Sequence, residues 1–312
     1  MALFGNLFHN YYYGKAGKGD YTIEQMPQNR RQLFFEIFKV RWSSLFGVNL
    51  LYMIVWIPTI IWTFINFAVI QSAEADTWQA YFTMYLLILF PCIAITGPFN
   101  AGITYILRNW ARDEHSFVLS DFKDALKANW KGALLLSTIS GILPVAVYVA
   151  WTFYGSLASQ SFIYMLPMAL VFFVAIVWKL SEMVMFTMLV TYDLSIKNVI
   201  RNSILVTIGK LPRALIIKLI TFLLPAIMLA LCIVIPSIEA YVILIGSLLY
   251  ICYLVAFHKL IICSYANWAC ETYLNPRIEG ARTNIGLRPE NWDDVEYIPQ
   301  DDEPQQQIPP KP

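Results

Sequence analysis

The sequence predicts an all-α polytopic membrane protein with six transmembrane helices, arranged as three helical hairpins that are each preceded by an amphipathic interfacial helix. Of the 312 residues, 58% are hydrophobic and only 14% are charged, whereas soluble domains are nearer half apolar and a quarter charged. A bilayer-spanning helix needs ~20 apolar residues. Six runs are long enough, at about 44–69, 79–107, 133–154, 162–191, 214–236 and 241–268.

The links inside each pair of runs indicate how the chain is threaded. They read QSAEADTW, GSLASQS and PSIEA, and they contain three acids and no lysine or arginine. All 22 basic residues lie in the other segments or at their membrane borders. Because basic residues near span ends are retained on the cytoplasmic side, we expect both termini in the cytoplasm.

Three repeats of one unit are expected within the membrane domain of residues 30–270, at about 30–110, 115–192 and 194–270. FKVRWSSLFGVNLL aligns with LKANWKGALLLSTI, which places Lys39 on Lys127 and Trp42 on Trp130, and IGKLPRALIIKLI is a looser third copy. Before the hairpins, apolar residues recur at helical spacing with charged residues opposite. This pattern is typical of a helix that lies in the inner membrane interface.

Two flanking segments are expected to lie outside the membrane domain. Residues 1–29 read as a flexible basic segment; their YGKAGKGDY lacks the Gly-x4-Gly-Lys-Ser/Thr pattern of a phosphate loop. Residues 271–312 read as a disordered tail rich in acids, Pro and Gln. The stretch 290–303 has seven acids and no base, a composition too poor in apolar residues to fold.

The stretch VWKLSEMVMF places Lys179 and Glu182 inside an apolar run. Three residues apart, they share a helix face and can pair. A charge at the bilayer centre costs ~2.5–3.5 kcal/mol, so a central pair would mark a functional site. Near the inner boundary, by contrast, a lysine can extend to the headgroups without any function. Lys259 and Lys218 stand at a similar level and favour the boundary, but both interpretations remain open.

ITGPFNAG in the second run is the other irregular point. Pro98 removes a backbone hydrogen bond and, with Gly97, is expected to kink or break the helix. Broken helices with polar side chains line substrate sites in many transporters, although most membrane prolines are structural. A transporter or channel is therefore the alternative function. Its polar path would comprise Asn49, Thr96, Asn100, Lys179 and Glu182.

No motif for catalysis, metal binding or cofactor binding has the required spacing. The five cysteines form no C-x-x-C pair, and neither H-E-x-x-H nor G-x-S-x-G occurs. Asp113, Glu114 and His115 are adjacent in RDEHSF, but His9 and His258 have no ligand spacing to them. We therefore expect no enzyme, no cofactor, no metal site and no nucleic-acid partner.

The strings GKAGKGDY, RRQLFFEIFKVRWSSLFGVNLLYMIVWIP and TGPFNAGITYILRNWARDEHSFVLSDFKDALKANWKGALL resemble the YesL-like family of bacterial integral membrane proteins, a domain of unknown function. The resemblance covers roughly residues 5–270 and is densest at 97–135. It implies a location in the bacterial cytoplasmic membrane. Members are often encoded beside sugar-importing ABC transporters and two-component regulators, which implies an accessory role in carbohydrate uptake or its sensing. The family has no assigned active-site residues.

The expected function is accordingly a non-enzymatic accessory or regulatory protein of carbohydrate uptake. Its environment is the lipid bilayer, and its expected partner is an ABC sugar permease or a sensor kinase. The cytoplasmic segment from RNWARDEH to SDFKDALKANW concentrates charge beside the irregular second run. The contact surface expected there comprises Arg112, Asp113, Glu114, His115, Asp121, Lys127 and Trp130.

Overall fold

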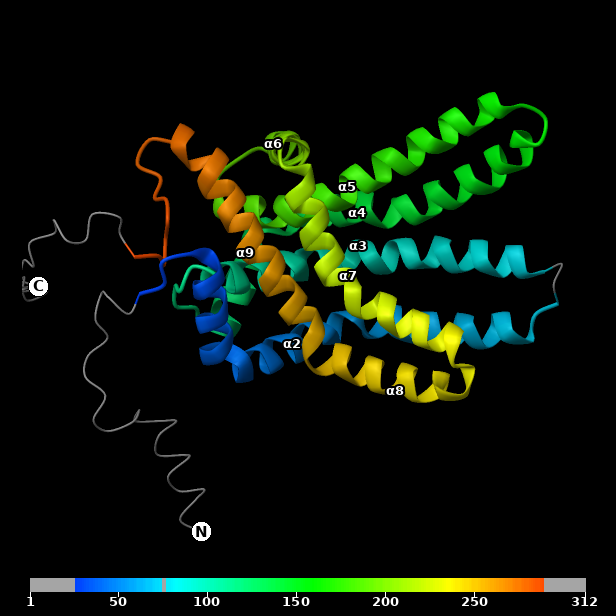
Figure 1. Ribbon diagram of the computed structural model, residues 1–312, viewed down its shortest axis with the longest axis horizontal. Helices are drawn as coiled ribbons and strands as arrows, with labels where there is room; N and C mark the ends of the chain where they lie inside the picture. The colour runs from blue at the N-terminus through cyan, green and yellow to red at the C-terminus, as the bar shows by residue number, and fades with distance from the viewer. Residues whose placement is uncertain (1–25, 75–76, 289–312) are drawn as a thin grey trace, which may run out of the picture.

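The computed structural model describes residues 26–74 and 77–288, and this part of the chain is helical without any strand (Figure 1). Short 3-10 turns occur at Phe162–Tyr164, Pro236–Ile238 and Asn275–Arg277, and a π-helical turn, Tyr250–Leu254, joins the last two helices. The α-helices are α2 (Arg30–Ser72), α3 (Trp78–Trp110), α4 (Val118–Ala158), α5 (Met165–Thr191), α6 (Ile196–Gly209), α7 (Leu211–Val234), α8 (Glu239–Leu249) and α9 (Val255–Tyr273).

Six helical segments in the described residues are long and apolar enough to cross a membrane, with α8 and α9 together forming the last of them. Between 6% and 33% of the residues in their most apolar windows are buried inside the protein. The remaining apolar surface has no protein to cover it, so it faces lipid. The chain is therefore a multi-pass membrane protein, as the sequence predicted.

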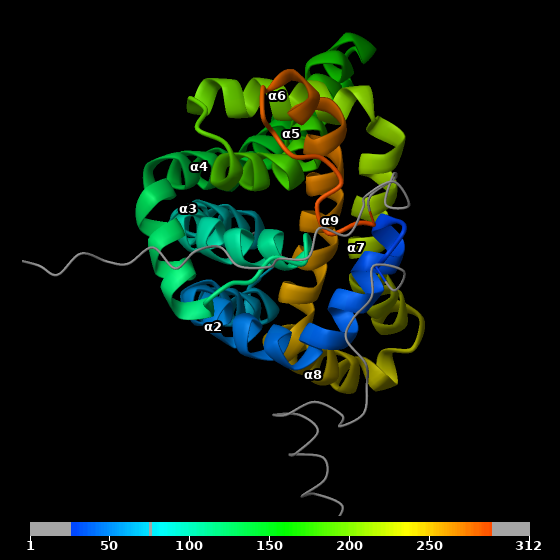
Figure 2. The same ribbon diagram turned by 90° about the vertical axis from the view of Figure 1, so that its left-hand side faces the viewer.

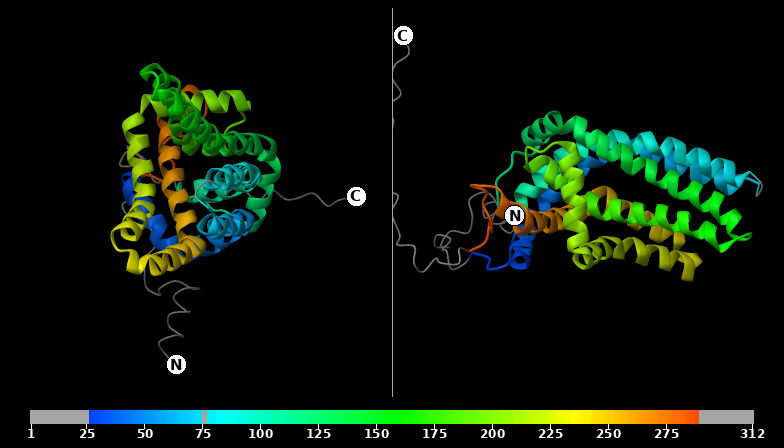
Figure 3. Two further views of the ribbon diagram at one scale, coloured as in Figure 1. Left: turned by 90° about the vertical axis from the view of Figure 1, so that its right-hand side faces the viewer. Right: turned by 90° about the horizontal axis from the view of Figure 1, so that it is seen from above.

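The spans run side by side, and the two ends of the bundle differ (Figures 1 and 3). The turns from α4 to α5 and from α7 to α8 lie at one end, together with the end of α2 and the start of α3. The first and last described residues lie at the other end, which we call the terminal end. α2 packs against α3, α3 along α4, α4 against α5, and α7 against α8.

The segments that lead the three pairs of spans differ from one another. α2 and α4 are single helices of 43 and 41 residues, which continue into the spans from the stretches that the sequence predicted as interfacial helices. Their first turns nevertheless run across the terminal end of the bundle (Figure 2). α6 is a separate helix of 14 residues, and Figure 1 shows it nearly end-on, across the direction of the spans.

Most of the protein core lies toward the terminal end. One cluster joins α2, α3 and α9 through buried side chains such as Ile37, Trp110 and Cys263. A second joins α5 to α4, α6, α7 and α9. The opposite halves of the helices instead expose large apolar side chains, such as Phe67, Trp151 and Leu170. Protein covers the helices at the terminal end, and lipid covers them elsewhere.

The close contact between α3 and α4 depends on glycine. The sequence predicted a kink or a break at Gly97 and Pro98, and α3 continues through both residues without a break. A Cβ atom at Gly97 would overlap Ala133 O and lie 2.9 Å from the Ser137 Cβ. On the facing helix, a Cβ at Gly141 would lie 2.8 Å from Phe90 O. Small residues let membrane helices approach at backbone distance.

We predict that Gly97→Ala lowers the free energy of unfolding by about 1–3 kcal/mol, because the added methyl group forces the two helices apart. Gly155→Ala is the matched control, since a Cβ at this helical position meets nothing within 4 Å. The measurement is SDS titration of the detergent-solubilised protein, followed by circular dichroism. Equal effects of the two substitutions would contradict the role of Gly97.

Candidate functional site

Lys179 and Glu182 form the ion pair that their spacing predicted. The Lys179 Nζ lies 2.9 Å from the Glu182 Oε2. The other carboxylate oxygen accepts a hydrogen bond of 2.8 Å from the Ser140 hydroxyl of α4, and the same hydroxyl accepts one of 2.9 Å from the Trp178 Nε1. The side chains are 43% and 21% exposed in the protein. The carboxylate therefore ties α5 to α4, and the lysine lies at the bundle surface.

Lys259 on α9 makes the second polar contact at this level. Its Nζ donates to the Asn100 Oδ1 of α3 and lies 5.1 Å from the centroid of the Phe186 ring on α5. Such a position over an aromatic face is attractive for a cation. Lys259 thus links three spans through one ammonium group.

These polar groups lie at a similar depth. At ~1.5 Å per residue, Lys179 is ~21 Å along α5 from Met165, and Lys259 is ~30 Å from the start of α8 at Glu239. Asn100 is ~33 Å from the start of α3. The hydrocarbon core of a bilayer is ~30 Å thick, so all three positions fall in the part of the membrane toward the terminal end or at its boundary.

The burial of α5 changes at the same level. From Met165 to Val177 no residue of the helix is buried, whereas Leu180 and nearly every residue from there to Met188 are. α6 and α9 cover this second half, with side chains such as Val199 and Ala266 in the same cluster. A helix that passes from lipid into protein at Lys179 favours the boundary interpretation of the ion pair.

Asn49, the first residue of the predicted polar path, has a structural contact instead. It is fully buried on α2. Its amide nitrogen donates to Tyr250 O and Ile251 O at 3.0 and 2.6 Å, and its amide oxygen accepts from Ala256 N at 2.7 Å. Tyr250 and Ile251 belong to the π-helical turn between α8 and α9, where the regular hydrogen bonds are interrupted, and Ala256 lies in the first turn of α9. Asn49 therefore satisfies the backbone of this turn.

The five residues of the predicted path do not form one connected chain of hydrogen bonds. Thr96 donates within its own helix, to Ile93 O at 2.7 Å. Asn100 bonds to Lys259, whereas Asn49 bonds to the π-helical turn. Together with the Lys179 and Glu182 pair, these are four separate arrangements. The geometry offers less support for a solute path than the sequence suggested.

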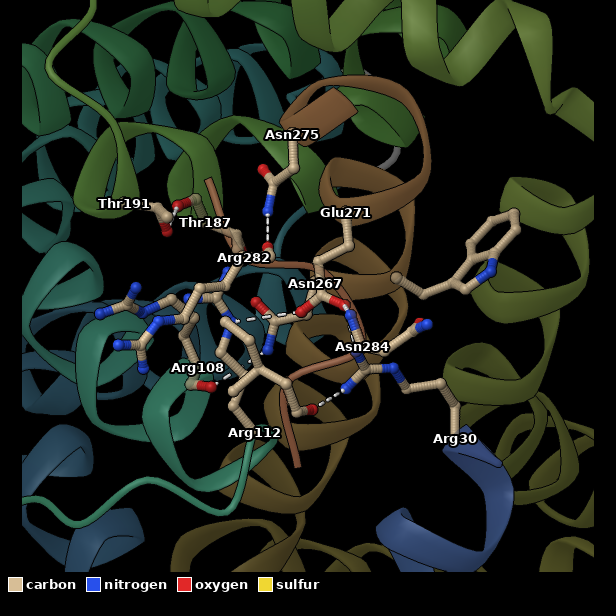
Figure 4. A network of polar contacts seen from close by, with 12 residues as sticks. Arg30, Arg108, Arg112, Thr187, Thr191, Asn267, Glu271, Asn275, Arg282 and Asn284 are labelled. Carbon is tan, nitrogen blue, oxygen red and sulfur yellow. Dashed lines mark hydrogen bonds and ion pairs between the residues drawn. The ribbon is translucent and has the colours of Figure 1, made fainter. Parts of the chain in front are cut away.

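A buried cluster at the terminal end centres on Glu271 (Figure 4). Its side chain is 4% exposed and forms an ion pair with Arg30 at the start of α2. The Arg112 Nε, after the end of α3, lies 3.7 Å from its other oxygen. The backbone N–H of Asn284 donates to the oxygen that bonds Arg30, at 3.0 Å. One carboxylate thus joins the first span, the second span, the last span and the segment that follows it.

Residues 271–288 are attached to the bundle, although the sequence placed them in the disordered tail. Arg30 donates to Ile285 O at 2.9 Å, and Arg288 N donates to Pro27 O at 3.0 Å. The Tyr192 hydroxyl donates to the Asn275 Oδ1, and burial raises the pKa of this phenol, so it keeps its proton. The described chain is therefore folded well past 271; the remainder of the predicted tail and residues 1–25 lie outside the described residues.

Sequence reasoning missed the Glu271 cluster. The available signal was that Glu271 is the one acid in α9, in the apolar stretch ANWACETY. An acid on an apolar helix is rarely buried without a cationic partner. Nothing in the sequence identified Arg30, which lies 241 residues away, as that partner.

The residues of the expected cytoplasmic contact surface differ in their exposure. Asp113, His115, Lys127 and Trp130 are exposed. Arg112 is not, because it is 6% exposed and faces Glu271, so its inclusion was wrong. Glu114 and Asp121 are half-buried.

The Asp121 carboxylate has a local role at the start of α4. It accepts a hydrogen bond of 2.9 Å from Phe117 N, next to the point where the helix begins at Val118. The predicted trio of Asp113, Glu114 and His115 gains no further ligand, since no group of three potential metal ligands comes together in residues 26–74 and 77–288.

Part of the chain is similar to a known protein family. A family described as "Protein of unknown function, DUF624" matches residues 59–151, from within α2 through α3 to most of α4. This segment is similar to the DUF624 family. The match confirms the resemblance to the YesL-like family that the sequence strings indicated. It covers less than a third of the 312 residues. No curated protein and no solved structure matches the chain.

We predict that the buried Glu271 contributes more to stability than the half-buried Glu182. Glu271→Gln leaves Arg30 and Arg112 without a counter-charge inside the protein, so it lowers the free energy of unfolding by about 3–5 kcal/mol. Under the boundary interpretation, Glu182→Gln costs less than about 1 kcal/mol, because Lys179 can extend to the headgroups without its partner. SDS titration of both purified variants measures this difference. A loss at Glu182 as large as at Glu271 would contradict the boundary interpretation.

Proposed function

We propose that this protein is a non-enzymatic accessory or regulatory membrane protein that binds a partner protein at the terminal end of the bundle. The binding surface would be the exposed residues around the start of α4, which we call the docking face. It comprises Asp113, His115, Lys123, Asp124, Lys127 and Trp130, all of them exposed.

The observation that supports this proposal is a hollow beside an exposed tryptophan. A cavity of about 460 Å³ lies between α4, the end of α5 and the start of α6, with Trp130, Lys131 and Asp193 among its lining residues. Trp130 is 46% exposed, and the Lys131 Nζ lies 5.6 Å from the centroid of its ring. Tryptophan at the edge of a pocket is a frequent energetic anchor of protein interfaces.

The nature of the partner follows from the family resemblance. Relatives encoded beside sugar-importing ABC transporters and two-component regulators favour an ABC sugar permease or a sensor kinase as the partner. The role would then be to assist or regulate carbohydrate uptake. Both kinds of partner present membrane and cytoplasmic parts at the level of the docking face.

We further propose that the protein lies in the bacterial cytoplasmic membrane with the terminal end inside. The short links at the opposite end lack lysine and arginine, as expected for loops on the outer side. In this orientation the first turns of α2 and α4, and the whole of α6, would lie in the inner interface. Each would then lead one of three helical hairpins.

The orientation predicts which residues are reachable from outside the cell. In a background without the five native cysteines, Ser159→Cys in the link between α4 and α5 should react with a membrane-impermeant maleimide in intact cells. Lys123→Cys on the docking face should react only after the membrane is permeabilised. Both positions are exposed in the protein, so burial does not explain a difference. The reverse pattern would refute the proposed orientation.

The docking face predicts a selective loss of partner binding. Lys127→Glu combined with Trp130→Ala should reduce recovery of a crosslinked ABC permease or sensor kinase by roughly tenfold or more, because the anchor of the interface is removed. Recovered proteins are identified by mass spectrometry after affinity purification from the native bacterium.

The internal repeat supplies a matched control. Lys39→Glu with Trp42→Ala makes the same change at the aligned positions of α2, where both residues are also exposed. If Trp130 only anchored the protein in the membrane interface, the two double variants would behave alike. Equal recovery of the partner in both would therefore exclude the docking face.

A further inference from the structure

A second cavity at the terminal end lies away from the docking face. It has a volume of about 990 Å³ and is bounded by the start of α2, α7, the end of α9 and residues 284–287. Its charged lining residues are three arginines, Arg30, Arg31 and Arg213, and a single acid, Glu271. The cavity is therefore cationic. No residue of the docking face lines it, and neither do Lys179 and Lys259.

Two of the three arginines are available to a ligand. Arg30 already bonds to Glu271. Arg31 and Arg213 have no acidic partner within salt-bridge distance among the residues that the structure describes. The Arg213 guanidinium lies 4.3 Å from the centroid of the Trp268 ring, which orients it without neutralising it.

The deeper wall of the same cavity is apolar. Ile217 and Ile220 follow Arg213 on α7, ~6 and ~10 Å further along the helix. Ile261 lies ~10 Å before Trp268 on α9. Ile220 is 48% exposed, so this wall opens toward the lipid-facing surface of α7. Cationic groups at the helix ends and isoleucines below them match a molecule with an anionic head and an apolar chain.

Tyr265 provides an independent indication of a ligand. It lines the cavity and is 6% exposed. Its hydroxyl group is buried without a hydrogen-bond partner in the described part of the protein. A buried polar group without a partner is destabilising, and an oxygen-rich ligand in the cavity would supply the missing hydrogen bond.

We propose that this cavity binds one anionic glycerophospholipid. Its phosphate would lie between Arg31 and Arg213, which can each donate two hydrogen bonds to it. An acyl chain would follow Ile217, Ile220 and Ile261 into the bilayer. Basic pockets between membrane helices are established sites for anionic headgroups. The proposal is independent of the partner protein, and it requires only that the helices lie in a bilayer.

The test is native mass spectrometry of the full-length protein in detergent, titrated with phosphatidylglycerol or phosphatidylcholine. We expect one phosphatidylglycerol to be retained about tenfold more strongly than phosphatidylcholine. Arg31→Gln with Arg213→Gln should weaken phosphatidylglycerol binding on the order of 30-fold, from about 5-fold for each lost cation. Arg31→Lys with Arg213→Lys should restore part of it, because the charge is kept.

Two controls separate this site from general attraction to a charged surface. Arg201→Gln removes an exposed arginine of α6 that is outside the cavity, and it should leave binding unchanged. Ile217→Asn should weaken the lipid while leaving the arginines in place, which shows that the acyl chain contributes. Equal retention of the two lipids, or wild-type binding by the double glutamine variant, would overturn the proposal.

Two other occupants of the cavity would be recognised in the same experiment. Displacement of the lipid by inorganic phosphate at comparable concentration would show that only the headgroup charge is bound. The acidic stretch 290–303 follows the lining residue Leu287 closely in the sequence and has the complementary charge. If phosphatidylglycerol bound only after truncation behind Arg288, that segment would be the occupant of the full-length protein, and the lipid assignment would be wrong.

Discussion

The spans of this protein are longer than a bilayer is thick, and this mismatch determines much of the structure. Five of the six apolar segments have 30 to 43 residues, whereas ~20 suffice to cross the hydrocarbon core. The surplus extends beyond the membrane, where apolar side chains need a protein cover. Because the surplus lies at the terminal end, the core forms there. α6, the first turns of α2 and the segment after α9 all pack onto that end.

Buried charge is the second consequence of this arrangement. Where the helices leave lipid, their ends carry arginines that would face water in an isolated helix. At the terminal end, the cover formed by residues 271–288 buries Arg112. The Glu271 carboxylate is the counter-charge of both Arg112 and Arg30. A buried ion pair adds little net stability compared with apolar packing, but removing one partner is costly. The cluster therefore makes the last span and the segment after it depend on the first two spans.

The sequence was sufficient to predict the features that depend on neighbouring residues. Six spans, the pairing of Lys179 with Glu182 and the family resemblance all follow from runs, spacings or strings of neighbouring residues. Helical periodicity, however, is the same in a continuous helix that bends as in two separate helices. It could not show that α2 and α4 are uninterrupted while α6 is separate.

Features that depend on distant residues could not be predicted from one sequence. Asn49 resembled a polar group on a solute path, because its partners, the backbone of the π-helical turn, lie about 200 positions later. Arg112 resembled a surface residue for the same reason, since its counter-ion comes from α9. Each is a buried polar group whose role is defined by its partner. Without the partner, such a residue cannot be distinguished from a functional one.

The two proposed binding regions rest on different parts of the chain. The docking face lies within residues 59–151, the segment that matches the DUF624 family. The lining residues of the cationic cavity all lie outside it, at 28–35, 213–220 and 261–287. They are nevertheless linked, because Glu271 in the cavity wall lies 3.7 Å from Arg112, the residue directly before Asp113, where the docking face begins. A ligand that draws Arg30 away from Glu271 would change the charge balance at Arg112, which is the physical route by which lipid binding could influence the docking face.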